Sequence, residues 1–96
     1  MSLLSVIVPC YNEQENVPYF YEEFMKNENF FKERSMDFEL IYVNDGSKDG
    51  TAAEVKKLHE TDARVRLISF SRNFGKEAAM YAGLEKSKGD YAVIMD

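Results

Sequence analysis

The sequence predicts an α/β fold in which helices cover both faces of a parallel β-sheet. Apolar runs that suit buried strands alternate with helical stretches along the whole chain, and neither a linker nor an internal repeat interrupts them. The apolar runs are nearly continuous, as expected for strands that are covered on both faces. Right-handed crossovers between such strands produce a twisted parallel sheet with two helical layers. We therefore expect a Rossmann-like parallel sheet.

The first strand is expected at residues 3–8, where a nearly continuous apolar run ends at Pro9. A helix should follow from residue 13 to roughly residue 34, because acidic residues occupy its first turn and apolar residues recur at helical spacing.

Three more apolar runs, at residues 38–43, 64–70 and 91–95, are expected to be strands, and the last of them also has the composition of a buried strand. Residues 51–59 and 75–87 should form the connecting helices. Small residues would let the last helix lie close to the sheet; they are Ala78, Ala79, Ala82 and Gly83.

The composition is that of one ordinary globular domain at most. The chain has 96 residues, of which 45% are hydrophobic and 30% are charged. An excess of 17 acidic over 12 basic residues argues against nucleic acid or an anionic membrane surface as a partner. No apolar run is long enough to span a membrane, and a single cysteine cannot form an internal disulfide, so a cytoplasmic location is expected for this chain.

The chain has one cysteine and one histidine, and neither has the setting of a nucleophile or a zinc ligand. Cys10 ends the first strand, and the one histidine, His59, lies far along the chain on a predicted helix. We therefore expect Cys10 to be a small packed residue. No group of His, Cys and Asp residues has the spacing of a zinc site.

The most informative segment is residues 43–51, Val-Asn-Asp-Gly-Ser-Lys-Asp-Gly-Thr, on a turn between a predicted strand and a predicted helix. Ligands of open α/β sheets bind at the carboxyl ends of the strands. An ionised Asp45 can only accept hydrogen bonds, so it suits a ring N–H of a nucleobase. Ser47, Asp49 and Thr51 could cap the helix, contact a ligand or do both, and Thr51 with Glu54 has the spacing of a capping box.

Three segments together resemble a known family. They are residues 5–13, Ser-Val-Ile-Val-Pro-Cys-Tyr-Asn-Glu; residues 43–51, quoted above; and residues 71–76, Ser-Arg-Asn-Phe-Gly-Lys. Their order and spacing are similar to those of family-2 glycosyltransferases with the GT-A fold. Within that family the third segment most resembles the polyprenyl-phosphate sugar transferases, the group of dolichyl-phosphate mannose synthase and bactoprenol glucosyltransferase. The resemblance covers essentially the whole chain and implies the strand order 3-2-1-4.

The resemblance also implies where the nucleotide of a UDP- or GDP-sugar donor would bind. Pro9 and Tyr11 would flank the base, with Tyr11 able to stack on its face, and Asn12 and Glu13 would lie in the same loop of the donor site. Tyr11 could instead be an exposed aromatic residue without a ligand. Glu13 could instead be an acidic residue that complements the helix dipole.

The other two segments would complete the donor site. Asp45 would accept a hydrogen bond from the base, with Ser47 close by, while Arg72 and Lys76 would bind phosphate oxygens at the start of a helix. An alternative for Lys76 is a solvated loop in which it pairs with an acidic neighbour.

Asp96 aligns with the first residue of the family's Asp-x-Asp metal motif. The resemblance implies that Asp96 binds the ribose or a pyrophosphate bridged by Mg²⁺ or Mn²⁺. Residues 1–96 are then the nucleotide-sugar-binding half of a GT-A domain, truncated at the start of this motif and inactive alone. The parent enzyme would transfer a sugar to a polyprenyl phosphate and would be membrane-associated on the cytoplasmic face.

Other classes of protein use similar strand ends. A non-catalytic flavodoxin-like or receiver-like domain is the main alternative, although a receiver would carry an acidic pair where Pro9, Cys10 and Tyr11 stand here. A Rossmann dehydrogenase is disfavoured because no G-x-G-x-x-G follows a strand. An exposed sheet edge could also make the chain a homo-oligomer or an interaction protein.

Overall fold

A computed structural model describes residues 2–95 of the chain. In chain order, its elements are β1 (Ser2–Cys10), α1 (Asn16–Met25), α2 (Glu28–Glu33), β2 (Met36–Asn44), α3 (Thr51–Thr61), β3 (Val65–Ser69), α4 (Lys76–Lys86) and β4 (Tyr91–Ile94). The strands of this part of the chain form one parallel sheet in the order β3-β2-β1-β4. The predicted fold class and strand order are therefore confirmed.

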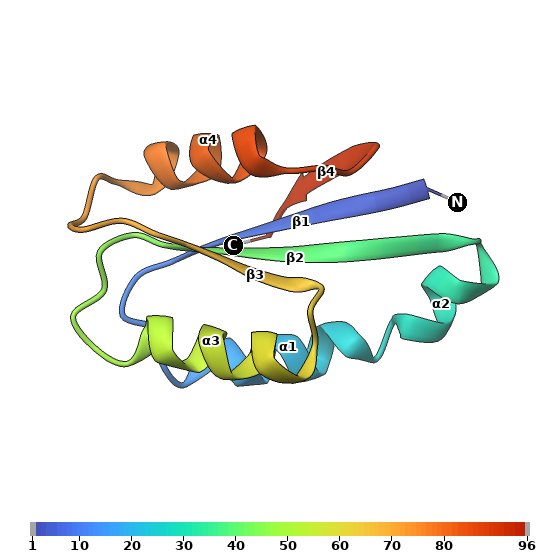
Figure 1. Cartoon of the computed structure of the whole chain (residues 1–96), viewed down its shortest axis with the longest axis horizontal. Coiled ribbons are helices and arrows are strands. Elements are labelled where there is room, and N and C mark those ends of the chain that lie inside the picture. The colour runs from blue at the N-terminus through green and yellow to red at the C-terminus, as the bar shows by residue number, and fades with distance from the viewer. Residues whose placement is uncertain (1, 96) are drawn as a thin grey trace.

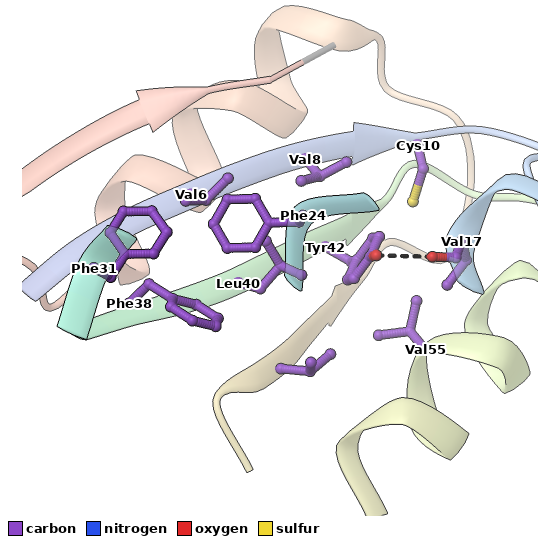
Figure 2. Close-up of a cluster of buried hydrophobic side chains, with 11 residues drawn as sticks. Val6, Val8, Cys10, Val17, Phe24, Phe31, Phe38, Leu40, Tyr42 and Val55 are labelled. Carbon is purple, nitrogen blue, oxygen red and sulfur yellow. Dashed lines mark hydrogen bonds between the residues drawn. The ribbon is translucent and has the colours of Figure 1, made fainter. Parts of the chain in front are cut away.

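Helices cover both faces of the sheet, as predicted. α1, α2 and α3 lie on one face, and α4 lies on the other (Figure 1). Alternate residues of the central strands point to the two layers. The larger core, on the side of α1, includes Val6, Val8, Phe24, Phe31, Phe38, Leu40, Tyr42 and Val55 (Figure 2). The smaller core, on the side of α4, contains Ile7, Ile41, Val43 and Ala79.

Two contacts fix the helices that flank the candidate site. The buried Tyr42 hydroxyl donates a hydrogen bond of 3.0 Å to the Val17 carbonyl oxygen, which holds the start of α1 on the sheet (Figure 2). On the other face, a Cβ atom at Gly83 would lie 2.4 Å from a methyl carbon of Ile7. The small residues of α4 therefore permit close packing, as predicted.

The single helix predicted over residues 13–34 is wrong in two respects. α1 begins only at Asn16, and Glu13 lies in the preceding turn, where its carbonyl oxygen accepts the Asn16 N–H at 3.0 Å. The helix also breaks at Asn27, whose side-chain amide donates to the Phe24 carbonyl oxygen at 3.2 Å. Asparagine interrupts helices through such local bonds because they compete with the backbone ladder.

β4 pairs with β1 as predicted, with Leu4 opposite Tyr91 and Ile7 opposite Ile94. The expectation that this strand is buried is wrong, because Tyr91 is 61% exposed and Val93 is 41% exposed. Both side chains lie on the α1 side of the sheet, where the edge strand remains open. No helix within residues 2–95 is long and apolar enough to cross a membrane.

Candidate functional site

Three loops meet at the carboxyl edge of the sheet: residues 11–15, 45–50 and 70–75. Backbone hydrogen bonds of 2.9 Å join the start of the second loop to the end of β1, and the start of the third loop to the end of β2. The hollow at this edge has a volume of about 140 Å³ and is lined by Pro9, Cys10, Tyr11, Glu13, Asp45 and Lys76. Most of the residues predicted to bind the donor nucleotide therefore surround one hollow.

A larger hollow, of about 220 Å³, lies beside the first one. It shares Pro9, Cys10 and Glu13 with the first hollow, but apolar side chains such as Val8 and Phe20 make up much of its wall. A charged ligand needs cationic or polar partners. The smaller hollow, which has Asp45 and Lys76 in its wall, is therefore the better candidate site.

Asp45 is the most buried acidic residue of the hollow, with only 4% of its surface exposed. One carboxylate oxygen accepts the Phe74 N–H at 2.8 Å, and the other accepts the Gly75 N–H at 3.0 Å. These N–H groups lie directly before α4, in the segment that was expected to bind phosphate oxygens. The structure shows that Asp45 already binds both of them and so joins the second loop to the third.

Gly46 lets these two loops touch. Its φ is +71°, and a Cβ atom there would lie 2.2 Å from the carbonyl carbon of Arg72. Only glycine fits such a close approach to backbone at a positive φ. Gly46 thus lets the second loop pack directly against the backbone of Arg72, while Asp45 holds the N–H of Phe74.

Asn12 and Ser47, both predicted to contact the nucleotide, bond to each other's loops. The Asn12 N–H donates to the Ser47 hydroxyl oxygen at 2.9 Å, and the Asn12 side-chain oxygen accepts the Lys48 N–H at 2.9 Å. Asn12 holds a positive φ of 52°, which asparagine tolerates better than most residues. In this structure, Asn12 and Ser47 therefore fix the first loop against the second.

The capping box predicted for Thr51 and Glu54 is wrong. Gly50 is the N-cap of α3, and no side-chain cap bond is formed there. Thr51 is the first helical residue; its N–H donates to Asp49 at 3.0 Å, and its hydroxyl oxygen accepts the Glu13 N–H at 2.9 Å. No local sequence pattern predicts this last bond, because its partners are 38 residues apart.

The cations near the site come from the third loop and from the start of α4. Arg72, in the third loop, is exposed, its guanidinium lies 4.7 Å from the centre of the Phe74 ring, and it forms no ion pair with another residue of the range 2–95. Lys76, the first residue of α4, is also exposed and lines the hollow, whereas Arg72 is not among the lining residues. The wall of the hollow thus has a buried carboxylate, the aromatic side chain of Tyr11 and the Lys76 cation.

Comparison with known proteins identifies the family of the chain. Residues 5–96 match the sequence profile of glycosyl transferase family 2. The chain belongs to this family. It is 47% identical over 94 residues to the putative glycosyltransferase CsbB of Bacillus subtilis (strain 168), and this alignment covers 98% of the chain and 28% of the relative. It is 40% identical over 93 residues to the prophage bactoprenol glucosyl transferase homolog of Escherichia coli (strain K12), and that alignment covers 97% of the chain and 29% of the relative.

Two solved structures have the same fold. The mannosyltransferase PcManGT from Pyrobaculum calidifontis, in complex with GDP-Man and Mn²⁺, matches 97% of this chain and 26% of its own, with a TM-score of 0.81 at 26% identity. TarS 1-349 of S. aureus, in complex with UDP-GlcNAc, matches 100% of this chain and 26% of its own, with a TM-score of 0.81 at 25% identity. The chain thus spans less than a third of the family members it resembles.

The family membership decides against the receiver-like alternative. Cys10 is 5% exposed, and its sulfur lies 3.5 Å from the Val43 carbonyl oxygen. Burial, assisted by the nearby carboxylates of Glu13 and Asp49, raises the pKa of the Cys10 thiol to about 12. The thiol is therefore neutral at physiological pH and is a packed residue of this family-2 chain, as predicted.

Asp96, the predicted metal ligand, lies outside the described residues. Within residues 2–95, no three His, Cys, Asp or Glu side chains come together as a metal site would require. Asp45 fits a metal poorly, since both of its oxygens accept backbone N–H groups. The predicted metal site therefore stays a prediction.

Proposed function

We propose that this chain binds the nucleotide of a nucleotide-sugar donor in a family-2 glycosyltransferase that transfers the sugar to a polyprenyl phosphate. The observation that carries the proposal is the hollow at the carboxyl edge of the sheet, which brings together Tyr11 of the first loop, Asp45 of the second loop and Lys76 at the start of α4. The full enzyme's acceptor is inferred from relatives named as bactoprenol glucosyl transferases.

The base would lie against the first and second loops. Tyr11 is 43% exposed, so the face of its ring is open for stacking. The Asp45 carboxylate has about four acceptor sites, of which two are used by Phe74 and Gly75. A base N–H would take a third site. Because the carboxylate is already held by two bonds, it would lose little freedom when the base binds.

The phosphates would lie on the side of the third loop. Arg72 and Lys76 can form charge-assisted bonds with phosphate oxygens, which are about twice as strong as bonds between neutral groups. Glu13, on the opposite wall, would then face away from the phosphates and towards the base or ribose. Pro9, at the end of β1, would support the base.

The metal and the acceptor belong to the parent enzyme. Asp96 would supply one carboxylate to Mg²⁺ or Mn²⁺, which typically takes its other ligands from phosphates and water. A metal there would neutralise the nucleoside diphosphate as it leaves. A polyprenyl phosphate is already anionic, so the need for a general base is reduced. Since this acceptor is a membrane lipid, the parent would work at the membrane, on the cytoplasmic face.

Calorimetric titration of the 96-residue chain with UDP and with GDP tests the proposal. We expect a dissociation constant nearer millimolar than micromolar, which corresponds to a binding free energy of about −4 to −6 kcal/mol, and no sugar transfer by the chain alone. Ribose 5-phosphate should bind more weakly than UMP, from which it differs only by lacking the base.

A matched pair of tyrosine variants locates the binding. Tyr11→Ala should weaken UDP binding at least about fivefold through loss of stacking. Tyr81→Ala is the control, since Tyr81 is 70% exposed, lies on α4 and lines neither of the two hollows. If neither nucleotide binds at millimolar concentration, or if both variants bind alike, the proposed site is wrong.

A further inference from the structure

We infer that Thr51 is a positioning residue of the donor site, whose buried hydroxyl holds the loop that carries Tyr11 and Glu13 at the edge of the hollow. The inference rests on the proposed function, because it concerns how the same site is built. It assigns a role to a residue that lines neither hollow and that, by its place in the helix, would otherwise be only a packed residue at the start of α3.

The surroundings of Thr51 are unusual for a helical threonine. Its side chain is completely buried, and its hydroxyl donates to the Asp49 carboxylate instead of the carbonyl oxygen one turn back. The hydroxyl oxygen is then free to accept, and it accepts the Glu13 N–H at 2.9 Å. A buried hydroxyl with one donated and one accepted bond is fully satisfied, and it fixes both partners in place.

Asp49 and Gln14 extend this contact into a small network. The Asp49 carboxylate also accepts the Thr51 N–H at 3.0 Å, and it lies 3.4 Å from the backbone nitrogen of Gln14. In return, the side-chain oxygen of Gln14 accepts the Gly50 N–H at 3.0 Å. The hydrogen bond from the Thr51 hydroxyl lowers the pKa of Asp49, so its carboxylate stays ionised at neutral pH. The first loop is thus bonded to the second through side chains of both loops.

The network reaches the hollow through the backbone of Glu13. Its N–H is held by Thr51, and its carbonyl oxygen accepts the Asn16 N–H at 3.0 Å, at the start of α1. Glu13 is therefore fixed on both sides, between α3 and α1. Tyr11 lies two residues before it and lines the same hollow. Loss of the Thr51 hydroxyl would free this loop while leaving Tyr11 and Glu13 themselves unchanged.

The test is a comparison of Thr51→Val with Thr51→Ser in the 96-residue chain. Valine has nearly the same shape but no acceptor for the Glu13 N–H, whereas serine keeps the hydroxyl. Thr61→Val is the matched control, because Thr61 is exposed at the other end of α3 and its hydroxyl contacts only its own helix, at Leu58. Amide hydrogen exchange of Glu13 and affinity for UDP are the two measurements.

We expect Glu13 exchange about five- to tenfold faster in Thr51→Val, relative to the amide of the core residue Val55, because one hydrogen bond is lost. UDP affinity should fall about threefold or more. Thr51→Ser should restore both values to near those of the unaltered chain, and Thr61→Val should change neither. A purely structural role would instead accelerate all amides together, or would leave UDP affinity unchanged in the folded variant. Either result overturns the inference.

Gln14→Met is the second variant, for the case that Thr51→Val does not fold. Gln14 is exposed, and substitutions at exposed positions usually change the unfolding free energy by less than about 0.5 kcal/mol. Gln14→Met should raise exchange of the Gly50 amide about threefold or more. No effect at Gly50 would show that the side-chain network does not hold the loops. If the unaltered chain binds neither UDP nor GDP, the proposed function fails, whereas the exchange results still decide whether Thr51 and Gln14 hold the first loop.

Discussion

At the amino ends of the strands, charged side chains pair with one another, whereas at the carboxyl ends polar side chains bond mainly to the backbone of neighbouring loops. Arg64 illustrates the first pattern: it forms ion pairs with Asp62 at 2.9 Å and Glu28 at 3.3 Å, and its guanidinium lies 4.3 Å from the centre of the Phe38 ring. Asp45 illustrates the second, since both of its partners are backbone N–H groups.

Glu39 gives the amino end a second cluster of paired groups. Its carboxylate accepts the Ser5 hydroxyl at 2.5 Å, the Arg66 guanidinium at 2.6 Å and the Lys88 N–H at 2.6 Å. Charges that satisfy one another leave little for a ligand. Side chains that bond to backbone hold the loops of the carboxyl end in place, and Arg72 and Lys76 are exposed at that end. We infer that the amino end serves stability and the carboxyl end recognition.

The largest effect is expected at Glu39. Glu39→Ala should lower the free energy of unfolding by about 3 kcal/mol, because it leaves the fully buried Ser5 hydroxyl and the Lys88 N–H without an acceptor. Urea denaturation measures this loss. Glu39→Gln keeps an acceptor and should lose less. A loss below about 1 kcal/mol in the alanine variant, or weaker nucleotide binding by its folded form, would break the division between the two ends.

Particular residues show what the sequence could and could not predict. The alternation of apolar runs and helices was enough for the α/β class, and the family resemblance supplied the strand order and brought Tyr11, Asp45 and Lys76 to one edge. The Glu39 cluster was not predicted, because its partners are 27 to 49 residues away in the chain. The bonds from Asp45 to Phe74 and Gly75 were missed for the same reason. Tertiary contacts of this kind have no local periodicity to reveal them.

Asp45→Asn tests a residue of the carboxyl end that should contribute both to stability and to nucleotide binding. Asparagine has one acceptor oxygen, so its amide nitrogen would face either Phe74 N–H or Gly75 N–H. We expect a loss of unfolding free energy of about 1–3 kcal/mol together with weaker UDP binding, measured by urea denaturation and calorimetry. Unchanged affinity in the folded variant would make Asp45 a residue of loop structure alone.

Protonation of Asp62 in acid should lower the free energy of unfolding. Hydrogen bonds from the Arg64 guanidinium lower the pKa of Asp62 to about 2, below the value near 3.9 of an unfolded chain. A lowered pKa stabilises the fold above pH 4, and this contribution is lost as the pH falls through 2. We expect it to be about 1–2 kcal/mol, given the partial exposure of Arg64.

Urea denaturation between pH 5 and pH 2 checks this expectation, with Asp62→Asn as the control that should flatten the pH profile. An equally steep profile in both proteins would assign the acid sensitivity to other carboxylates.

The smallest effect on stability is expected at the open edge of the sheet. β4 is an edge strand of the described sheet, and unpaired strand edges with exposed apolar side chains favour pairing with a second copy. The chain should self-associate weakly, and a two-fold dimer is the expected closed form. Val93→Lys should shift light scattering towards the monomer and change the unfolding free energy by less than about 0.5 kcal/mol. A monomer at high micromolar concentration in both proteins would contradict this.

The most direct test of the division between the two ends is a map of NMR amide shifts during titration with UDP and GDP. We expect the amide resonances of Tyr11, Gly46 and Gly75, at the carboxyl end, to shift at millimolar nucleotide, while those of Glu39 and Arg64, at the amino end, stay in place. Shifts centred on the amino end, or none at the carboxyl end with either nucleotide, would contradict it.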